Sequence, residues 1–165
     1  MKKVSILIPA YNEQESLPLL YDKLTEVVGG LPQYVWEFMF VNDGSRDRTL
    51  EMLQELRAKD ARVNYVDLSR NFGKEVAMLA GFDYVSGDCV VIMDADLQHP
   101  PHMIAKFLEK WEEGYEDVYA VRKTRGKESK LRKNLTMTYY RFLQHTTRVE
   151  VLRTVGDFRL LERKC

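Results

Sequence analysis

Short apolar runs alternate with longer amphipathic segments along most of the chain, and this alternation limits the folds open to it. The runs have the length and the content of β-branched and aromatic residues that buried strands show. We expect strands at Val4–Ile8, Trp36–Val41, Val63–Leu68, Cys89–Met93 and Val118–Val121. Strands that alternate with helices indicate an α/β domain with a mainly parallel central sheet flanked by helices.

The segments between these runs carry apolar residues at helical spacing. In the first of them, Leu17, Leu20 and Leu24 share one face, and Gly29-Gly30 ends the helix. Pro100-Pro101 suits the start of a later helix. The expected helices are Ser16–Val28, Arg48–Lys59, Gly73–Val85, one from Pro100-Pro101 to about Glu113, and one from about Lys130 to Arg148.

Composition narrows the class of protein. A chain of 165 residues corresponds to one domain, and its zero formal net charge argues against a general nucleic-acid binder. Cys89 and Cys165 are the only cysteines, so the sequence offers neither a disulfide framework nor a zinc site, which suits a reducing compartment. No apolar window in the sequence is long enough to span a bilayer.

Two carboxylates directly follow the strand expected at Cys89–Met93. Asp94 and Asp96 are separated only by Ala95. Successive side chains of an extended chain point to opposite faces, so the chain must turn here for both carboxylates to converge. Open α/β sheets bind ligands at such strand ends. Two adjacent carboxylates favour a bound cation, which predicts Mg²⁺ or Mn²⁺ carrying substrate phosphates. A helix cap and a turn residue are the alternative.

Two polar residues follow this pair. Gln98 offers another neutral oxygen near the carboxylates. His99 is a possible ligand, but Mg²⁺ and Mn²⁺ prefer oxygen. A single histidine before Pro100-Pro101 is therefore expected to have a structural role.

Polar motifs follow the first two strands as well. Pro9 is expected to end the first strand, and the loop after it presents Tyr11 and Glu13 at the same sheet edge. A strand end followed by a capping residue is the alternative for this motif. After the second strand, Asp43 is placed to hydrogen-bond a base or a ribose. We interpret Ser45, Asp47 and Thr49, which follow it, as turn and capping residues.

Two further motifs carry charge. Arg70 and Lys74 stand at the start of a helix, where they either meet phosphate or are solvated surface charges. Asp157 lies between Gly156 and Phe158, which suits a tight turn, and an ordinary strand with a turn is the alternative for this motif. The sequence has no G-x-G-x-x-G and no Walker A motif, so a nucleotide would be held through a metal and strand-end carboxylates.

Taken in order, these motifs resemble those of the family 2 glycosyltransferases of the GT-A fold. The branch they resemble is that of the polyprenyl-phosphate sugar transferases, which includes dolichyl-phosphate mannosyltransferase and the undecaprenyl-phosphate glucosyltransferases. The resemblance covers nearly the whole chain. It rests on five motifs: Pro9–Glu13, Asn42–Ser45, Ser69–Lys74, Asp94–Gln98 and Gly156–Leu160.

The resemblance implies a Rossmann-like sheet and a metal-dependent, inverting transfer of a hexose from a UDP- or GDP-sugar to a polyprenyl phosphate. It places the metal on Asp94, Asp96 and Gln98, and the reacting centre at Asp157 and Asp96. The donor contacts that it implies are Pro9, Ala10, Tyr11, Glu13, Val41, Asp43, Lys74, Asp94, Ala95 and Arg122. A transferase of the same family that acts on a saccharide hydroxyl, and a nucleotide-sugar-binding module without turnover, remain alternatives.

Two expectations concern the end of the chain and its surroundings. Enzymes of this branch usually continue into membrane-associated helices, so residues 1–165 are expected to be one catalytic domain, either truncated or a short relative. In the basic stretch 122–133, Arg122 is expected to meet the diphosphate, and the stretch as a whole an anionic membrane or a phosphorylated acceptor. A solvated loop and helix face is the alternative. The stretch lacks interleaved aromatic residues, so we expect no nucleic-acid partner. The expected location is cytoplasmic, at the inner face of the membrane.

Overall fold

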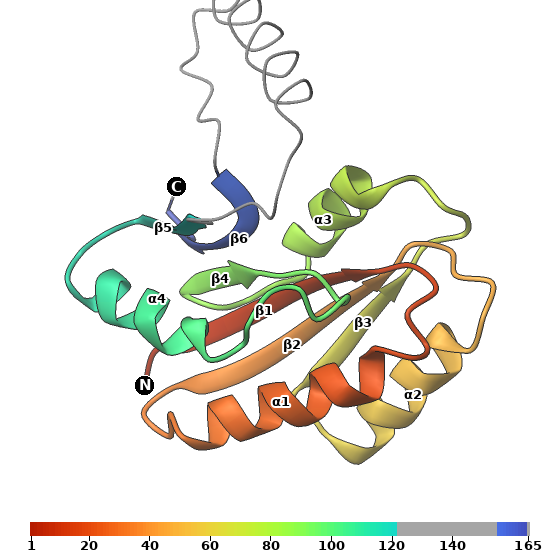
Figure 1. The fold of residues 1–165 in the computed structure, drawn as a ribbon, viewed down its shortest axis with the longest axis horizontal. Coiled ribbons are helices and arrows are strands. Elements are labelled where there is room, and N and C mark those ends of the chain that lie inside the picture. The colour runs from red at the N-terminus through yellow and green to blue at the C-terminus, as the bar shows by residue number, and fades with distance from the viewer. Residues whose placement is uncertain (122–154, 165) are drawn as a thin grey trace, which may run out of the picture. The chain divides into compact units, whose positions relative to one another are not determined.

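The computed structural model describes residues 1–121 and 155–164, and strands and helices alternate along them (Figure 1). The elements are β1 (Lys3–Ala10), α1 (Leu17–Gly29), β2 (Val35–Asn42), α2 (Thr49–Lys59), β3 (Val63–Asp67), α3 (Lys74–Phe82), β4 (Cys89–Ile92), α4 (Met103–Glu112), β5 (Asp117–Val121) and β6 (Val155–Glu162). The chain divides into two compact units. One consists of Met1–Tyr119 with Asp157–Cys165, and the other of Ala120–Gly156. The description below concerns the first unit.

Within the described residues the strands form one six-stranded sheet in the order β3-β2-β1-β4-β6-β5. β1 pairs in parallel with β2 and with β4, and β2 pairs in parallel with β3. β6 is antiparallel to β4. The sheet is therefore mainly parallel, as predicted, and the carboxyl ends of β1 to β4 lie at one edge.

Helices cover both faces of this sheet. α1, α2 and α4 lie on one face, and α3 lies on the other (Figure 1). Side chains alternate between the two faces of the sheet along β2, so each face has its own core. Phe38 and Phe40 face α1 and α2, while Met39 and Val41 face Ala77 of α3. These side chains are all buried. The strand ends are thus fixed from both sides.

The elements up to β5 lie where the sequence predicts them and differ only at their ends, whereas β6 is not among the five expected strands. β1 continues through Pro9, which pairs with Val41, whereas the prediction ends the strand there. β4 pairs with β1 only from Val4 to Leu7, so proline is tolerated where a single neighbouring strand pairs with it. α3 ends at Phe82, three residues early, since Val85 leaves the helix to pack into the core. The helix predicted from about Lys130 to Arg148 lies outside the described residues.

A buried carboxylate ties β1, β2 and the turn before β4 together. Glu37 accepts hydrogen bonds from Ser5 Oγ, from Lys3 Nζ at 3.0 Å and from the backbone N–H of Ser86 at 2.9 Å. Ser86 Oγ donates to it as well, at 2.8 Å. Burial alone would raise the pKa of Glu37, but these hydrogen bonds outweigh it and hold the pKa below its ordinary value. Glu37 is therefore a structural anion.

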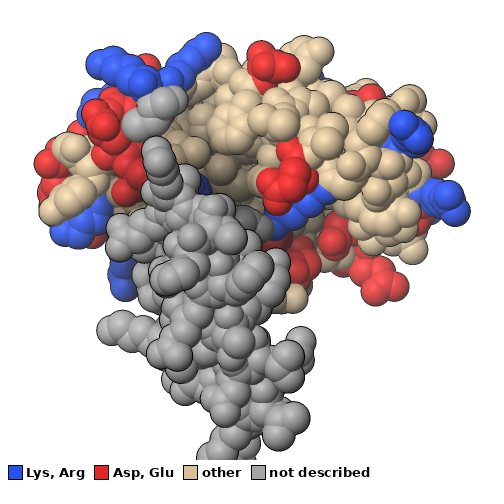
Figure 2. Space-filling view, turned by 90° about the horizontal axis from the view of Figure 1, so that it is seen from above, with Lys and Arg blue, Asp and Glu red and all other residues tan. Residues whose placement is uncertain are grey.

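The surface of the described residues has no simple charge pattern on the face drawn in Figure 2. Acidic and basic side chains lie interspersed there, with uncharged surface between them. Among the described helices none combines the length and apolar character that a membrane span needs.

Candidate active site

One cavity lies at the carboxyl edge of the parallel strands and gathers residues from four loops. Its volume is about 320 Å³. It is lined by Pro9, Ala10, Tyr11, Glu13, Asp43, Asn71, Gly73, Lys74, Asp94, Ala95 and Asp96. The structure therefore brings most of the predicted donor and metal residues together, although they are far apart in the sequence.

The loops after β1 and β2 are joined by reciprocal hydrogen bonds between side chains and backbone. The N–H of Asn12 donates to Ser45 Oγ at 2.9 Å, and Asn12 Oδ1 accepts from the N–H of Arg46 at 2.8 Å. The N–H of Glu13 donates to Thr49 Oγ1 at 2.9 Å. Glu13 itself accepts a hydrogen bond from Ser16 Oγ. These bonds fix the first two motifs relative to each other.

Asp47 serves the start of α2 and the first loop together. Its Oδ1 accepts from the N–H of Thr49 at 3.0 Å, and its Oδ2 accepts from the N–H of Gln14 at 3.2 Å. Burial raises the pKa of Asp47, but the hydrogen bonds from Thr49 and Gln14 outweigh it and leave the pKa lowered. Ser45, Asp47 and Thr49 thus act as structural residues, with partners in a loop that the sequence alone does not connect to them.

Asp43 joins the second motif to the third. Its side chain is almost fully buried, at 3% exposure. Oδ1 accepts from the N–H of Phe72 at 2.7 Å and Oδ2 accepts from the N–H of Gly73 at 2.9 Å. The Asp43 carboxylate therefore sits directly before α3, where free amides favour an anion. Each oxygen keeps a second lone pair, so Asp43 can still accept from a ligand in the cavity.

Gly44 allows the second and third loops to approach each other. Its φ is +63°, and a Cβ at this position would lie 2.2 Å from the carbonyl carbon of Arg70. Only glycine meets both conditions. The close approach places Asn71 and Gly73 at the cavity.

Lys74 joins the third motif to the fourth. Its Nζ lies 2.5 Å from Asp94 Oδ1, and both residues line the cavity. The first carboxylate of the pair thus already attracts a cation. The second, Asp96, is exposed, and its Oδ1 accepts from the N–H of Gln98 at 3.0 Å.

This arrangement fits a divalent cation that shares its coordination with a ligand. Among the described residues no three or more His, Cys, Asp or Glu side chains gather into a metal site. Asp94 and Asp96 line the cavity from one loop, and hard cations such as Mg²⁺ and Mn²⁺ take carboxylate oxygens together with substrate phosphates. The donor set therefore suits a cation that arrives with a phosphate-bearing ligand.

Several predicted residues lie elsewhere. The side chain of Val41 is fully buried between the sheet and α3, so only its backbone can serve a ligand. Gln98 is exposed and does not line the cavity, and Arg70 lines a neighbouring cavity of about 430 Å³. Asp157 lies within β6 and not in the tight turn that the sequence suggests, because this segment continues into the residues that pair with β4; its side chain is not among those described. Arg122 and the rest of the basic stretch 122–133 lie outside the described residues.

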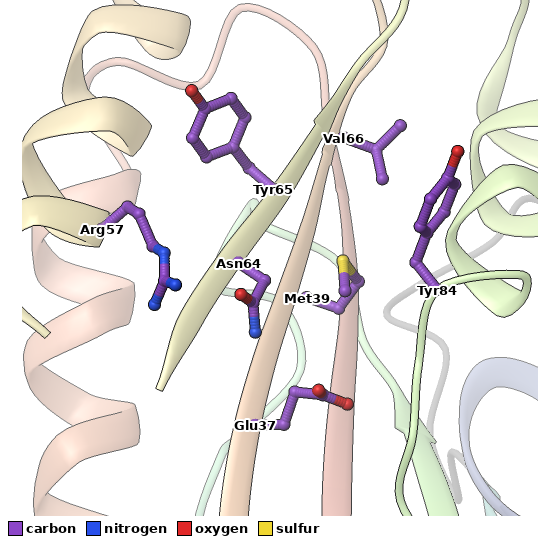
Figure 3. A pocket seen from close by; sticks show the side chains of 7 residues that line it. All are labelled: Glu37, Met39, Arg57, Asn64, Tyr65, Val66 and Tyr84. Atoms are coloured by element: carbon purple, nitrogen blue, oxygen red, sulfur yellow. The ribbon is translucent and has the colours of Figure 1, made fainter. Parts of the chain in front are cut away.

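Another cavity lies over the other half of β2 and β3, away from the strand ends. Its volume is about 450 Å³, and none of the predicted site residues lines it. Figure 3 shows Val66 and Tyr84 on one side of β3 and Arg57 and Tyr65 on the other. Glu37, the one acidic residue of its lining, is engaged in the structural network described above. The chemistry therefore concentrates at the carboxyl edge.

Comparison with known sequences shows one family. The model of "Glycosyl transferase family 2" matches residues 5–165. The "Uncharacterized glycosyltransferase YkcC" of Bacillus subtilis is 45% identical over 160 residues, which are 97% of this chain and 49% of that protein. A "Bactoprenol glucosyl transferase" of Shigella phage SfX is 36% identical over 162 residues, which are 98% of this chain and 53% of that protein. The chain thus spans about half the length of these relatives.

Comparison with solved structures shows the fold. A mannosyltransferase of Pyrobaculum calidifontis, solved with GDP-Man and Mn²⁺, has a TM-score of 0.68 at 19% identity and covers 99% of this chain and 45% of its own. Glucosyl-3-phosphoglycerate synthase of Mycobacterium tuberculosis, solved with Mn²⁺, UDP-glucose and phosphoglyceric acid, has a TM-score of 0.67 at 24% identity and covers 99% and 57%. The expected GT-A fold is confirmed.

Proposed function

The chain belongs to glycosyl transferase family 2, and from that premise we propose that it transfers a hexose from a UDP- or GDP-sugar to a polyprenyl phosphate, with inversion at the anomeric carbon. The observation that carries the proposal is the cavity at the carboxyl edge that collects Asp43, Lys74, Asp94 and Asp96. The relatives named bactoprenol glucosyl transferase support a polyprenyl acceptor and glucose as the transferred hexose.

The donor would lie across the strand ends. Pro9, Tyr11 and Asp43 offer an apolar surface, an aromatic ring and a carboxylate to the nucleoside half of the donor. Asp94 and Asp96 would hold a divalent cation at the diphosphate, and when bound this cation would offset the charge that grows on the leaving group. Lys74 adds a positive charge from the chain itself at the same place.

The reaction breaks the bond between the anomeric carbon and the diphosphate oxygen. An oxygen of the acceptor phosphate attacks that carbon from the opposite side, and the bonding pair leaves with the nucleoside diphosphate. A phosphate monoester has a second pKa of about 6, so the acceptor is largely ionised near neutral pH and needs no strong base. Asp157 would then orient the acceptor. With a hydroxyl acceptor, Asp157 would instead be the base.

A transfer assay tests this proposal. The 165-residue chain is incubated with labelled UDP-glucose or GDP-mannose, Mn²⁺ and a short polyprenyl phosphate, and label is counted in the organic phase. We expect transfer with one donor, none to the unphosphorylated polyprenol, and none by Asp94→Asn. Transfer to a saccharide instead would favour the hydroxyl-acceptor alternative. Donor binding without transfer to either acceptor would favour a binding module.

A further inference from the structure

The loop that carries Asp94 and Asp96 has a compact shape of its own. Leu97 adopts φ +63°, which is uncommon for a residue with a branched side chain. The N–H of Gln98 folds back onto Asp96 Oδ1 at 3.0 Å. Ala95, which separates the two aspartates in the sequence, is buried. Such an uncommon backbone conformation persists only where contacts with the surrounding structure hold the loop at points near its ends.

His99 supplies one of these points by closing the loop on its first residue. Its Nδ1 accepts a hydrogen bond from the backbone N–H of Asp94 at 3.0 Å. A nitrogen that accepts carries no proton, so the neutral ring carries its proton on Nε2. The bond spans the whole segment between Asp94 and His99. It therefore sets the direction in which the chain leaves β4, and with it the position of both carboxylates.

The ring of His99 is itself fixed by aromatic packing. His99 is 9% exposed and stacks on Phe158 of β6, with ring centroids 5.0 Å apart and planes within 8° of parallel. Phe158 is 2% exposed and packs in turn against Phe107 of α4, with the two ring centroids 4.7 Å apart. Phe158 directly follows Asp157 in the strand. One side chain thus connects the carboxylate loop to the strand that carries the last motif.

We propose that His99 is a positioning residue, which holds the Asp94–Asp96 loop in its metal-binding form through Nδ1 and aligns it with β6 through the ring. The proposal rests on the proposed function, because it gives the loop a metal to bind. When a residue that orients a metal ligand without binding the metal is removed, the affinity for the metal typically falls by about 10–100-fold.

Two variants separate the hydrogen bond from the packing. His99→Asn retains an acceptor close to the position of Nδ1 but loses the ring, whereas His99→Phe retains a ring to stack on Phe158 but loses the acceptor. The measurement is calorimetric titration of Mn²⁺ with UDP into each protein. We expect His99→Phe to weaken binding at least tenfold and His99→Asn to stay within about threefold of the wild type.

A merely structural role predicts the opposite order. If His99 only fills space, the phenylalanine variant binds like the wild type and the asparagine variant, with its cavity, is the weaker of the two. That order would overturn the proposal. The free energy of unfolding of both variants, measured in urea, shows whether a loss of binding follows from a loss of folding.

A second readout does not depend on the proposed function. Hydrogen exchange at the Asp94 amide, followed by NMR without metal or nucleotide, should be slow in the wild type and in His99→Asn and at least tenfold faster in His99→Phe. Equal exchange in all three would refute the role of Nδ1. If the wild type fails to bind Mn²⁺ with any nucleotide, the proposed function fails, while the exchange rates still decide whether His99 orders the loop.

Discussion

The carboxylate of Asp43 offers a sharp test of how far the site is organised before any ligand arrives. Asp43→Asn keeps the size of the side chain but replaces one of its two acceptor oxygens by an NH₂ group. The acceptors face the N–H groups of Phe72 and Gly73 at 2.7 and 2.9 Å, so one N–H then faces a donor. One hydrogen bond to a charged acceptor, worth about 1.5–3 kcal/mol, is lost, and one N–H left unpaired costs about 1–3 kcal/mol. Because this loop is partly exposed, we expect the free energy of unfolding to fall by about 3 kcal/mol, near the lower end of the sum of these two contributions.

The assay is urea unfolding of the chain without ligands. With a slope of about 2 kcal/mol per molar urea, the midpoint should fall by about 1.5 M. Asp22→Asn is the matched control, since Asp22 is exposed on α1 and its substitution should change stability by less than about 0.5 kcal/mol. If Asp43→Asn were as stable as this control, the carboxylate would not hold the loop before α3, and the account of a preorganised site would be refuted.

Three further predictions follow from single residues. Gly44→Ala should cost more than about 3 kcal/mol or prevent folding, whereas Gly114→Ala, also at positive φ but with open space around its Cβ position, should cost about 1 kcal/mol in the same urea assay. Because the folded pKa of Glu37 is lowered, its contribution is complete above the unfolded pKa of about 4.3 and is lost as pH falls through the folded value; the stability difference between wild type and Glu37→Gln should therefore shrink below about pH 4. Burial raises the pKa of Cys89 to about 12, so mass spectrometry should find its thiol unlabelled by iodoacetamide in the native chain and labelled in urea.

The sequence predicts the fold and the family well because both depend on local patterns. Apolar runs and helical spacing place β1 to β5 and the described helices within a few residues, but they do not single out β6 as a strand. Five short motifs in a fixed order are far more specific than any one of them, and the family they indicate is confirmed by the match over residues 5–165. The misplaced ends, at Pro9 and Val85, depend on which neighbouring strand pairs there and on which side chain the core receives.

The site is predicted less completely, because its organisation depends on contacts between loops. The sequence places Asp43 and Asp94 at the same sheet edge, and the cavity contains both. It gives no sign that Asp43 receives two amides from the next loop, or that Ser45 pairs with Asn12, because these partners are tens of residues apart. Val41 is different. It directly follows Phe40 in an apolar run of β2, and such a run already indicates that side chains on both faces of the strand are buried. This signal favours a structural role for the Val41 side chain.

The central claim is that the strand-end cavity binds a nucleotide sugar together with a divalent cation. Calorimetric titration of the chain with UDP-glucose and with GDP-mannose, each with and without Mn²⁺, tests it most directly. The account predicts saturable binding of one of the two that requires Mn²⁺, is weakened at least tenfold by Asp94→Asn and is unchanged by Asp22→Asn. Binding of neither nucleotide sugar in the presence of Mn²⁺, or equal binding by the Asp94→Asn variant, would contradict it.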